Sequence, residues 1–333
     1  KAQVSIPMPF DKLKNDSEYF VKVQFLLKDD MPWAEKGFVT AEEQILLQEA
    51  MARPSISAVT ASAGKVKLDK SDTSIKTVSG DGFVAKFDME TGTIYSLAYG
   101  GKTIITDGNG PKLDALRAFT NNDNWFYSQW FEHGLHNLQH RATNSTVLER
   151  NDGTVVLAFT VESQAPNGAK IKGGTSTGKN SIEELTDRRF GENDFKFTTN
   201  QIWTVYPDGS VELQSSITSN RPSLVLPRLG YLMKIPQQYA DFTYYGRGPI
   251  DNYADRKSGQ FIEQHRNTVA GEFVNFPKPQ DMGNHEDVRW CALTDPDGEG
   301  AVFVATDRLS VSALQYSALD LILKPYRSAM VVP

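Results

Sequence analysis

The strongest constraint on the fold of this chain is a recurring pattern of short β-forming runs that are separated by turn residues. Two such runs surround the turn Glu-Thr-Gly at 90–92, and two stronger runs surround Pro-Asp-Gly at 207–209. Proline presets φ and glycine supplies a positive φ, so the stretches 82–105 and 197–218 predict β-hairpins. Because helical periodicity is scarce, the pattern indicates an all-β sandwich. Further strands are predicted at 17–28, 301–306 and 309–317.

The composition excludes several classes of protein. The 333 residues are 39% hydrophobic and 23% charged, as expected for a globular protein with a sizeable core, and their number suggests two domains. The net charge of −6 argues against nucleic acid as a partner, because phosphate binding needs a basic surface. No apolar run of about 18 residues is present, so no membrane partner is predicted. The single cysteine, Cys291, excludes an internal disulfide and a cysteine-based metal site, and it is expected to be a buried, inert thiol.

One segment, 121–138, has weak helical periodicity, and Gly134 within it would weaken a continuous helix. We expect a short helix or an ordered loop there. A helix would bring His133, His136 and His140 near one face, but their spacing matches no zinc signature, so we predict no metal site. The stretch TNNDNW at 120–125 predicts a capped turn, with a sugar-binding polar patch as the alternative.

Two stretches are typical of connections between elements. Residues 50–64 contain a proline and many small residues, as linkers do, and residues 163–180 lack apolar periodicity, which predicts an exposed inter-strand loop. The motifs GxSxG, GxGxxG, HExxH and the P-loop are absent. Carboxylates are plentiful, but none stand out as the pair that a retaining glycosidase needs. The residues alone therefore indicate two β-rich domains without an evident catalytic centre.

The most unusual segment is YYGRGPIDNYADRKSG at 244–259, which is too polar for a core strand. Gly246 and Gly248 allow unusual φ values, and Pro249 fixes its own φ. Local rules leave two interpretations open, a rigid connection between strands or a gating loop with a glycine hinge. The charged residues that can pair within the loop or with a neighbour are Arg247, Asp251, Asp255 and Arg256.

Further stretches can be set beside this segment: MPWAEKGFVTAEEQILL at 31–47, LRAFTNNDN at 116–124, PRLG at 227–230 and FPKPQDMGNHEDVRW at 276–290. In this order, and together with 245–259, they resemble motifs of the large β-galactosidases of glycoside hydrolase family 2. Four positions need comment. Asp251 stands where the family usually has Glu, Asp281 falls at a second such Glu, Phe119 replaces a proline, and Asn121 replaces an aspartate.

The resemblance implies a definite architecture. Residues 1–52 would be the C-terminal part of an immunoglobulin-like β-sandwich, residues 53–63 a linker, and residues 64–333 a large antiparallel supersandwich like that of galactose mutarotases. The catalytic glutamates of the family lie in a TIM barrel upstream. The chain, which starts at Lys1 without Met, is therefore expected to be an excised piece that is inactive alone. The family's magnesium and sodium ligands lie mainly upstream as well, so no cofactor is expected in this chain. The parent would be a homo-oligomer that hydrolyses terminal β-D-galactosides with retention.

The resemblance also implies which residues border the substrate. In the family, the glycine-proline loop lies at the active-site mouth and moves as ligands bind, with Gly248 as the expected hinge here. A tryptophan that the family sends into the active site from a GGDxSW loop has no counterpart, and that loop would fall near Pro325–Tyr326. Carried over by position, the loop residues are Gly246, Arg247, Gly248, Pro249, Asp251, Asn252, Tyr253, Asp255 and Arg256, and a second polar motif contains Arg117, Asn121, Asn122 and Asp123.

Two other functions remain open beside a non-catalytic portion of a β-galactosidase. An independent carbohydrate-binding module would bind galactose without the rest of an enzyme. A mutarotase-like epimerase would need a positioned histidine or glutamate acid–base pair, and the histidines here do not match the motifs of that family. The low cysteine count fits cytoplasm and periplasm equally, so no compartment is predicted.

Overall fold

Strands make up most of the regular structure, which confirms the predicted all-β fold class. The computed structural model describes residues 10–50, 65–173 and 180–324, together with residues 3, 5, 7 and 8. The strands are β1 (Tyr19–Leu26), β2 (Val39–Gln48), β3 (Lys67–Asp69), β4 (Ile75–Gly80), β5 (Phe83–Asp88), β6 (Thr93–Tyr99), β7 (Lys102–Ile105), β8 (Lys112–Asp114), β9 (Gln139–Glu149), β10 (Val155–Gln164), β11 (Ala169–Gly173), β12 (Asn180–Glu184), β13 (Phe197–Val205), β14 (Val211–Ser219), β15 (Gly230–Leu232), β16 (Asp241–Gly248), β17 (Phe261–Thr268), β18 (Asn284–Thr294) and β19 (Gly300–Ser312). The helical elements are η1 (Phe10–Lys12), η3 (Asn121–Trp125), α2 (Tyr127–Glu132), η4 (Leu135–Asn137) and α3 (Ala318–Leu323).

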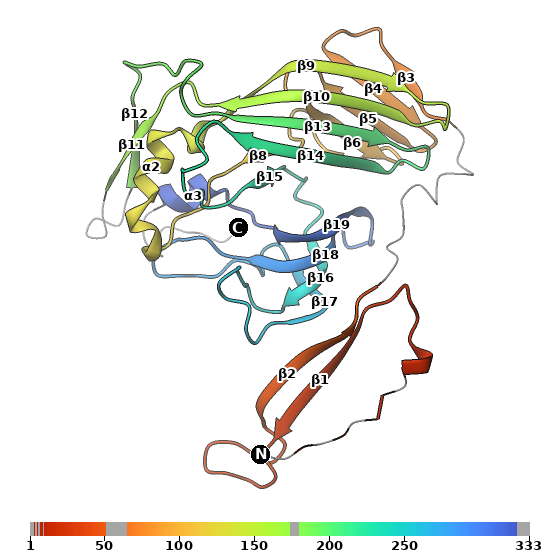
Figure 1. Ribbon diagram of the computed structural model, residues 1–333, viewed down its shortest axis with the longest axis vertical. Helices are drawn as coiled ribbons and strands as arrows, with labels where there is room; N and C mark the ends of the chain where they lie inside the picture. Colours follow the sequence, from red (N-terminus) through yellow and green to blue (C-terminus); the bar gives the residue numbers. More distant parts are fainter. Residues whose placement is uncertain are drawn as a thin grey trace.

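Two antiparallel sheets packed face to face form a sandwich, seen at the top of Figure 1. One sheet has the strand order β3-β4-β5-β6-β7, and the other has the order β14-β13-β10-β9. Along β5, Phe83, Ala85 and Phe87 alternate with more exposed residues, so one face of the strand is apolar. This face meets Leu157 and Trp203 of the opposite sheet in one core. Both predicted hairpins are confirmed, since the turns at 90–92 and 207–209 join β5 to β6 and β13 to β14.

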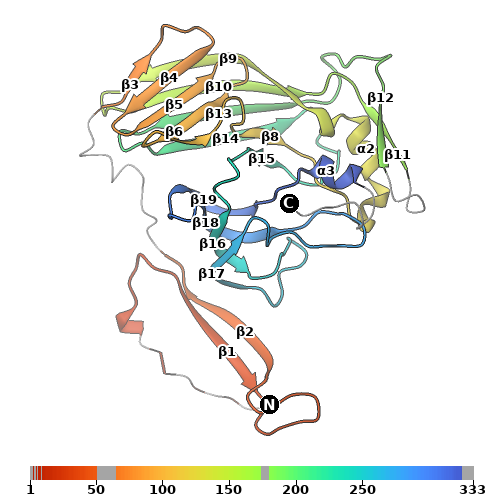
Figure 2. The ribbon, with the colours of Figure 1, turned by 180° about the vertical axis from the view of Figure 1, so that it is seen from behind.

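Short helices and strand pairs enclose a second core beside the sandwich (Figures 1 and 2). Trp130 and Phe131 of α2 and Leu321 of α3 are buried in it. The helix of the segment 121–138 is short, as predicted, because the chain turns at Gly134 with a left-handed φ of 75°. The three histidines therefore share no helical face: His133 caps α2, His136 lies in η4 and His140 lies in β9.

A third antiparallel sheet, of order β17-β16-β18-β19, lies between the sandwich and the β1–β2 hairpin in both ribbon views. Phe242, Tyr244, Val288 and Cys291 form its buried cluster. Burial raises the pKa of the Cys291 thiol to about 12, which makes it unreactive, as the sequence predicted. The two short strands predicted at 301–306 and 309–317 are parts of one strand, β19, which ends at Ser312.

The β1–β2 hairpin contacts the third sheet through polar groups. The side-chain amide of Gln44 donates a hydrogen bond to the Ile262 carbonyl (3.0 Å) and accepts one from the Ile262 N–H (2.8 Å). Because β17 is the edge strand, these backbone groups have no neighbouring strand to bind. Glu18, which precedes β1, accepts hydrogen bonds from Arg289 at 2.8 and 2.9 Å and from the Tyr245 hydroxyl at 3.1 Å. We refer to these contacts of Gln44 and Glu18 as the hairpin junction.

One expectation about the connections is wrong. In the described part of the stretch 163–180, residues 163–173 and Asn180, the chain is not a continuous exposed loop, because Ala165, Asn167 and Ala169 are buried and β11 pairs with β12. Ala169 is buried in the core that contains α2, which is distant in sequence, so no local periodicity reveals it. The linker predicted at 53–63 and the join at Pro325–Tyr326 both lie outside the described residues. Within the described ranges, no helix is long and apolar enough to cross a membrane.

Candidate functional site

The unusual segment at 244–259 forms the end of β16 and the loop 249–260 that leads to β17. Both of its first two glycines are buried and closely packed. A Cβ on Gly246 would lie 2.7 Å from Val288 Cγ2, and one on Gly248 would lie 2.3 Å from the Tyr244 hydroxyl oxygen. Neither glycine has a positive φ, so the expectation of unusual φ values was wrong. Glycine is needed at these positions because the backbone approaches its neighbours closely, and not because of a left-handed conformation.

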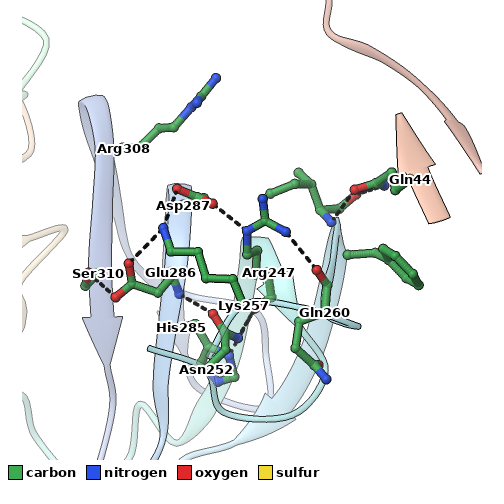
Figure 3. A network of polar contacts seen from close by, with 12 residues as sticks. Gln44, Arg247, Asn252, Lys257, Gln260, His285, Glu286, Asp287, Arg308 and Ser310 are labelled. Carbon is green, nitrogen blue, oxygen red and sulfur yellow. Dashed lines mark hydrogen bonds and ion pairs between the residues drawn. The ribbon is translucent and has the colours of Figure 1, made fainter. Parts of the chain in front are cut away.

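The two ends of the loop are tied to each other (Figure 3). Arg247 Nη1 donates to the Gln260 carbonyl at 2.9 Å, and the Ile250 N–H donates to Gln260 Oε1 at 3.1 Å. Within the loop, Tyr253 and Arg256 form an isolated antiparallel bridge, and the Arg256 guanidinium lies 5.3 Å from the centre of the Tyr253 ring. Pro249 follows a cis peptide bond at the start of the loop. The loop is therefore a closed, internally bonded unit.

Asn252 joins this unit to β18. Its side chain is fully buried and donates to the carbonyls of Arg247 and Ile250, both at 3.0 Å, while its Oδ1 accepts from the Glu286 N–H at 2.9 Å. Its backbone exchanges two further hydrogen bonds with Asn284. All of the amide's hydrogen-bonding groups are thus used within the protein, so Asn252 orders the loop.

Asp251 connects the loop to a second sequence motif. Its carboxylate is 8% exposed and accepts hydrogen bonds from Arg256 Nη2 at 3.1 Å and from the Gly283 N–H at 3.4 Å. Gly283 follows Asp281 in the stretch PQDMG, and its φ of 66° favours glycine. The loop is therefore held against the segment that presents Asp281.

Asp281 lies where several separate segments meet. Its N–H donates to the Ala118 carbonyl at 3.1 Å, which fixes it beside the motif at 116–124. Burial raises the pKa of this carboxyl, and the negative charge of Asp123 adds to the rise. Arg228, Tyr253 and Arg117 lower the pKa, but burial outweighs them. The pKa of Asp281 therefore lies above its ordinary value. A carboxyl with a raised pKa among arginines is characteristic of functional sites, although structural networks also produce it.

The motif at 116–124 is itself an ordered turn. Asp123 is buried and accepts hydrogen bonds from Arg117 Nη2 at 2.6 Å and from the Thr120 N–H at 2.8 Å. The prediction of a capped turn is therefore confirmed, and Arg117 and Asp123 are brought together. Asn121 and Asn122 are exposed, and Asn121 accepts a long hydrogen bond of 3.5 Å from Lys278.

Arg117 Nε is buried at this meeting point without a hydrogen-bond partner, and the Tyr253 hydroxyl, which is also buried, interacts with the Asp281 carboxyl. Burial, followed by the charges of Asp281 and Asp251, raises the pKa of Tyr253, so its hydroxyl stays protonated. Buried donors are normally satisfied by protein, water or ligand. Arg117, Tyr253 and Asp281 can therefore bind an oxygen-bearing group such as water or a sugar hydroxyl. We call this group of residues, with Asp123, the Asp281 cluster.

The structure separates the predicted residues into two sets. Arg117, Asp123 and Tyr253 belong to the Asp281 cluster, and Asp251 connects it to the loop. Asp255 and Arg256 are exposed, and Asn252 is committed to the fold. Sequence reasoning left Asp281 and Arg228 out of the predicted site, although both stand in the quoted stretches PQDMG and PRLG.

Two of the histidines contact carboxylates. His285 is fully buried, and its Nε2 lies 2.7 Å from Glu272 Oε2 beneath the Tyr244 ring. His136 contacts Glu184 at 2.8 Å. Across the described residues, no group of three or more His, Cys, Asp or Glu side chains could hold a metal ion.

Comparison with known proteins gives two family matches. A model described as "Beta galactosidase small chain" matches residues 79–331, and one described as "Beta-galactosidase, domain 4" matches residues 1–48. The second match ends close to the boundary at 52 that the sequence predicted, although it does not test the linker itself.

Individual relatives agree with these matches. The β-galactosidase of Priestia megaterium is 26% identical over 322 residues, which are 96% of this chain and 28% of that protein. The β-galactosidase of Halalkalibacterium halodurans is 27% identical over 330 residues, 96% of this chain and 29% of that protein. The β-galactosidase of Lactobacillus delbrueckii subsp. bulgaricus is 26% identical over 323 residues, which are 94% of this chain and 28% of that protein. The chain thus spans less than a third of the length of these relatives.

Proposed function

The chain belongs to the β-galactosidase small-chain family, and on that premise we propose that it is a non-catalytic, C-terminal portion of a β-galactosidase of glycoside hydrolase family 2. The whole enzyme would hydrolyse terminal β-D-galactosides. The portion described here would form one wall of the substrate cleft and support assembly with the catalytic barrel of the same chain.

The observation that carries this proposal is the Asp281 cluster. Three stretches that are far apart in sequence, at 116–124, 227–230 and 245–259, all contribute residues whose charges act on Asp281 or contact its segment. A structural turn would not require this convergence of arginines, a tyrosine and a carboxyl. Partly buried polar groups that retain hydrogen-bonding capacity suit the recognition of sugar hydroxyls.

The chemistry would be divided between the two parts of the enzyme. Retaining glycosidases use two carboxyl groups about 5 Å apart, one as nucleophile and one as acid and then base. We propose that both carboxyl groups lie in a barrel upstream, together with the ligands for magnesium and sodium ions. The Asp281 cluster and the loop 249–260 would then bind and orient the sugar and exclude water, while no proton or covalent transfer would be assigned to them.

The proposal is tested by activity measurements on two proteins. The 333-residue chain should not hydrolyse a nitrophenyl β-galactoside, whereas the protein encoded by the reading frame extended upstream of Lys1 should do so. In that longer protein, Arg117→Ala should lower kcat/KM by about tenfold or more, the size expected for loss of one charged hydrogen bond. Hydrolysis by the short chain, or unchanged kinetics of the variant, would contradict the proposed division of roles.

The same proteins also test a competing function, that of an independent carbohydrate-binding module. An independent carbohydrate-binding module would bind galactose in the 333-residue chain at millimolar affinity or better. Trp125, which is 83% exposed beside Asp123 in η3, is the natural fluorescent reporter of such binding. Saturable galactose binding that is abolished by Arg117→Ala would favour the binding module over a wall that is completed only by the barrel.

A further inference from the structure

Asp287 has an unusual backbone conformation. Its φ is 54°, and it is the one non-glycine residue with positive φ in the described ranges. Aspartate tolerates this conformation better than most residues, but the conformation is still strained. The residue lies where the pairing of β18 with β19 shifts between His285 and Val288, which is a β-bulge. Something in the surrounding structure must therefore hold Asp287 in place.

The contacts of Asp287 reach both ends of the loop 249–260 (Figure 3). Its carboxylate accepts from Arg247 Nε at 2.5 Å, just before the loop, and from Lys257 Nζ at 3.3 Å, near the end of the loop. Lys257 also lies 3.2 Å from the neighbouring Glu286. Burial would raise the pKa of Asp287, but Arg247 and Lys257 outweigh it, and the pKa falls below its ordinary value. The carboxylate is therefore ionised at neutral pH.

The backbone of Asp287 reaches the hairpin junction. Its carbonyl accepts a hydrogen bond of 2.5 Å from Arg289 Nη1, and the same guanidinium binds Glu18. The second contact of the junction, from Gln44, is made to Ile262 in β17, directly after the loop. A polar cleft of about 380 Å³ lies between the hairpin and the loop, and its lining includes Gln44, Lys257 and Asp287.

Each charged side chain along this path has a partner within the protein. Arg289 donates hydrogen bonds to Glu18 and to the backbone carbonyl of Asp287. Arg247 and Lys257 donate to the side-chain carboxylate of Asp287. Removing one member leaves a partly buried charge without its partner, which costs more than the pair contributes. The arrangement can therefore transmit the loss of a contact at the hairpin to the loop.

We propose that Asp287 is a positioning residue that couples the loop 249–260 to the N-terminal hairpin, so that the conformation of the loop depends on how the hairpin is docked. The element that regulates the loop is the β1–β2 hairpin, in the segment that the model described as "Beta-galactosidase, domain 4" matches. This coupling rests on contacts within the chain and does not depend on galactosidase activity, so its failure can be told apart from failure of the proposed function.

The first test is Asp287→Asn in the full 333-residue chain, followed by hydrogen–deuterium exchange. Asparagine tolerates positive φ equally well and keeps the shape, so the change isolates the charge. Amide exchange in 249–260 should accelerate by about tenfold, and amides of β1 and β2 should accelerate by a smaller factor. Unchanged exchange in either region would overturn the coupling.

The reciprocal test is Glu18→Gln, which alters only the hairpin side. Exchange in 249–260 should rise several-fold although Glu18 touches no residue of the loop, and exchange in β10 and β13 should stay constant. A merely structural effect would accelerate all amides together, and that result would contradict the proposal. Asp255→Asn is the matched control, because Asp255 is an exposed carboxylate in the loop that is not part of the path, and it should change nothing.

Discussion

The sandwich and the hairpin junction are held together by opposite kinds of contact. Between the two sandwich sheets, Phe87, Leu157 and Trp203 are almost completely buried and pack in one apolar core, and the Trp203 indole adds a hydrogen bond of 3.2 Å to the Gly92 carbonyl. At the junction, by contrast, the decisive contacts are the amide of Gln44 and the carboxylate of Glu18. The exposed Phe25 and Ile45 of the hairpin show how little apolar surface it buries here.

This difference determines how each region should respond to perturbation. Apolar burial is non-directional and depends on the area removed from water, so the sandwich should tolerate changes in pH or charge. The junction depends on ionised groups at fixed geometry, so single charges and single atoms matter there. The molecule thus combines a robust framework with a tunable attachment, and the tunable part is the one that reaches the candidate site.

The largest effect is predicted for Phe87→Ala in the sandwich. Phe87 is fully buried and lies edge-to-face with Trp203 at 5.8 Å between ring centres. Its truncation should lower the free energy of unfolding by about 3–5 kcal/mol, as seen for buried aromatic residues. Chemical denaturation followed by tryptophan fluorescence measures this loss.

The control lies on the same strand. Val84 is 39% exposed on the outer face of β5, so Val84→Ala should cost less than about 1 kcal/mol. Equal losses for the two variants would mean that the inner face of the sandwich is not the source of its stability. The contrast with the junction would then no longer hold.

The sandwich was also the part that the sequence predicted best. Alternating residues along β5 and β13 and the turn at 207–209 identify strands and hairpins because the signal is local. The strand at 169–173 was missed because Ala169 is its one buried residue and is covered by the core that contains α2, so the strand has no alternating pattern of its own. Strand prediction therefore succeeded where the strand's own sequence determines its faces.

Only part of the candidate site could be predicted from the sequence. Arg117, Asp123 and the loop residues were found through a resemblance, since each motif alone is short and ambiguous. The contact of Glu18 with Arg289 joins residues 271 positions apart, and the strain at Asp287 arises from a bulge with no glycine to mark it. Contacts set by tertiary packing leave no periodic trace in the sequence.

The second prediction concerns Gly248→Ala, at the boundary between the third sheet and the loop. The new Cβ would lie 2.3 Å from the Tyr244 hydroxyl and 2.8 Å from His265 Cδ2, so the buried cluster must shift. We expect a loss of about 2–3 kcal/mol in the free energy of unfolding from overpacking, and altered kcat and KM in the longer enzyme.

Two other glycines distinguish the two possible causes of this loss, which are steric contact of the added Cβ and an unfavourable backbone conformation. Gly259 has a φ of 78° but open space around its Cα, so Gly259→Ala tests conformation alone and should cost about 1 kcal/mol. Gly230 has neither constraint and should be nearly silent when changed to alanine. If Gly259→Ala proved costlier than Gly248→Ala, conformation and not contact would govern the loop.

A smaller loss is predicted for Glu18→Gln at the junction. The side chains of Glu18 and Arg289 are only 13% and 14% exposed, so the variant leaves a largely buried guanidinium with a weaker acceptor. The expected loss is about 1–2 kcal/mol by thermal denaturation, which is less than for a core truncation. Glu49→Gln is the matched exposed change, since Glu49 is 62% exposed in its pair with Arg308, and it should cost well under 1 kcal/mol. Similar losses for the two variants would show that burial does not set the strength of the junction.

The smallest effect is a response to acid that is confined to the junction. Burial would raise the pKa of Glu18, but Arg289 from β18, the Tyr245 hydroxyl from β16 and Arg308 from β19 outweigh it, so the pKa lies below its ordinary value of 4.5. A depressed pKa means that the unfolded state binds the proton more readily. The stabilisation is therefore complete above pH 4.5 and is lost as the pH falls through the lower, folded-state pKa.

Asp281 should oppose this trend, because burial raises its pKa and its protonated form is favoured in the folded state. Lowering the pH should therefore loosen the hairpin while it relieves the charge at the Asp281 cluster. Hydrogen exchange, corrected for the intrinsic pH dependence, should show faster exchange in β1 and β2 below pH 4.5 with little change in β10 and β13. Glu18→Gln should remove most of the response in the hairpin, since glutamine cannot titrate. If the hairpin of that variant still responded to acid, the protons would be acting at another group, and the junction would not be the acid-sensitive part of the molecule.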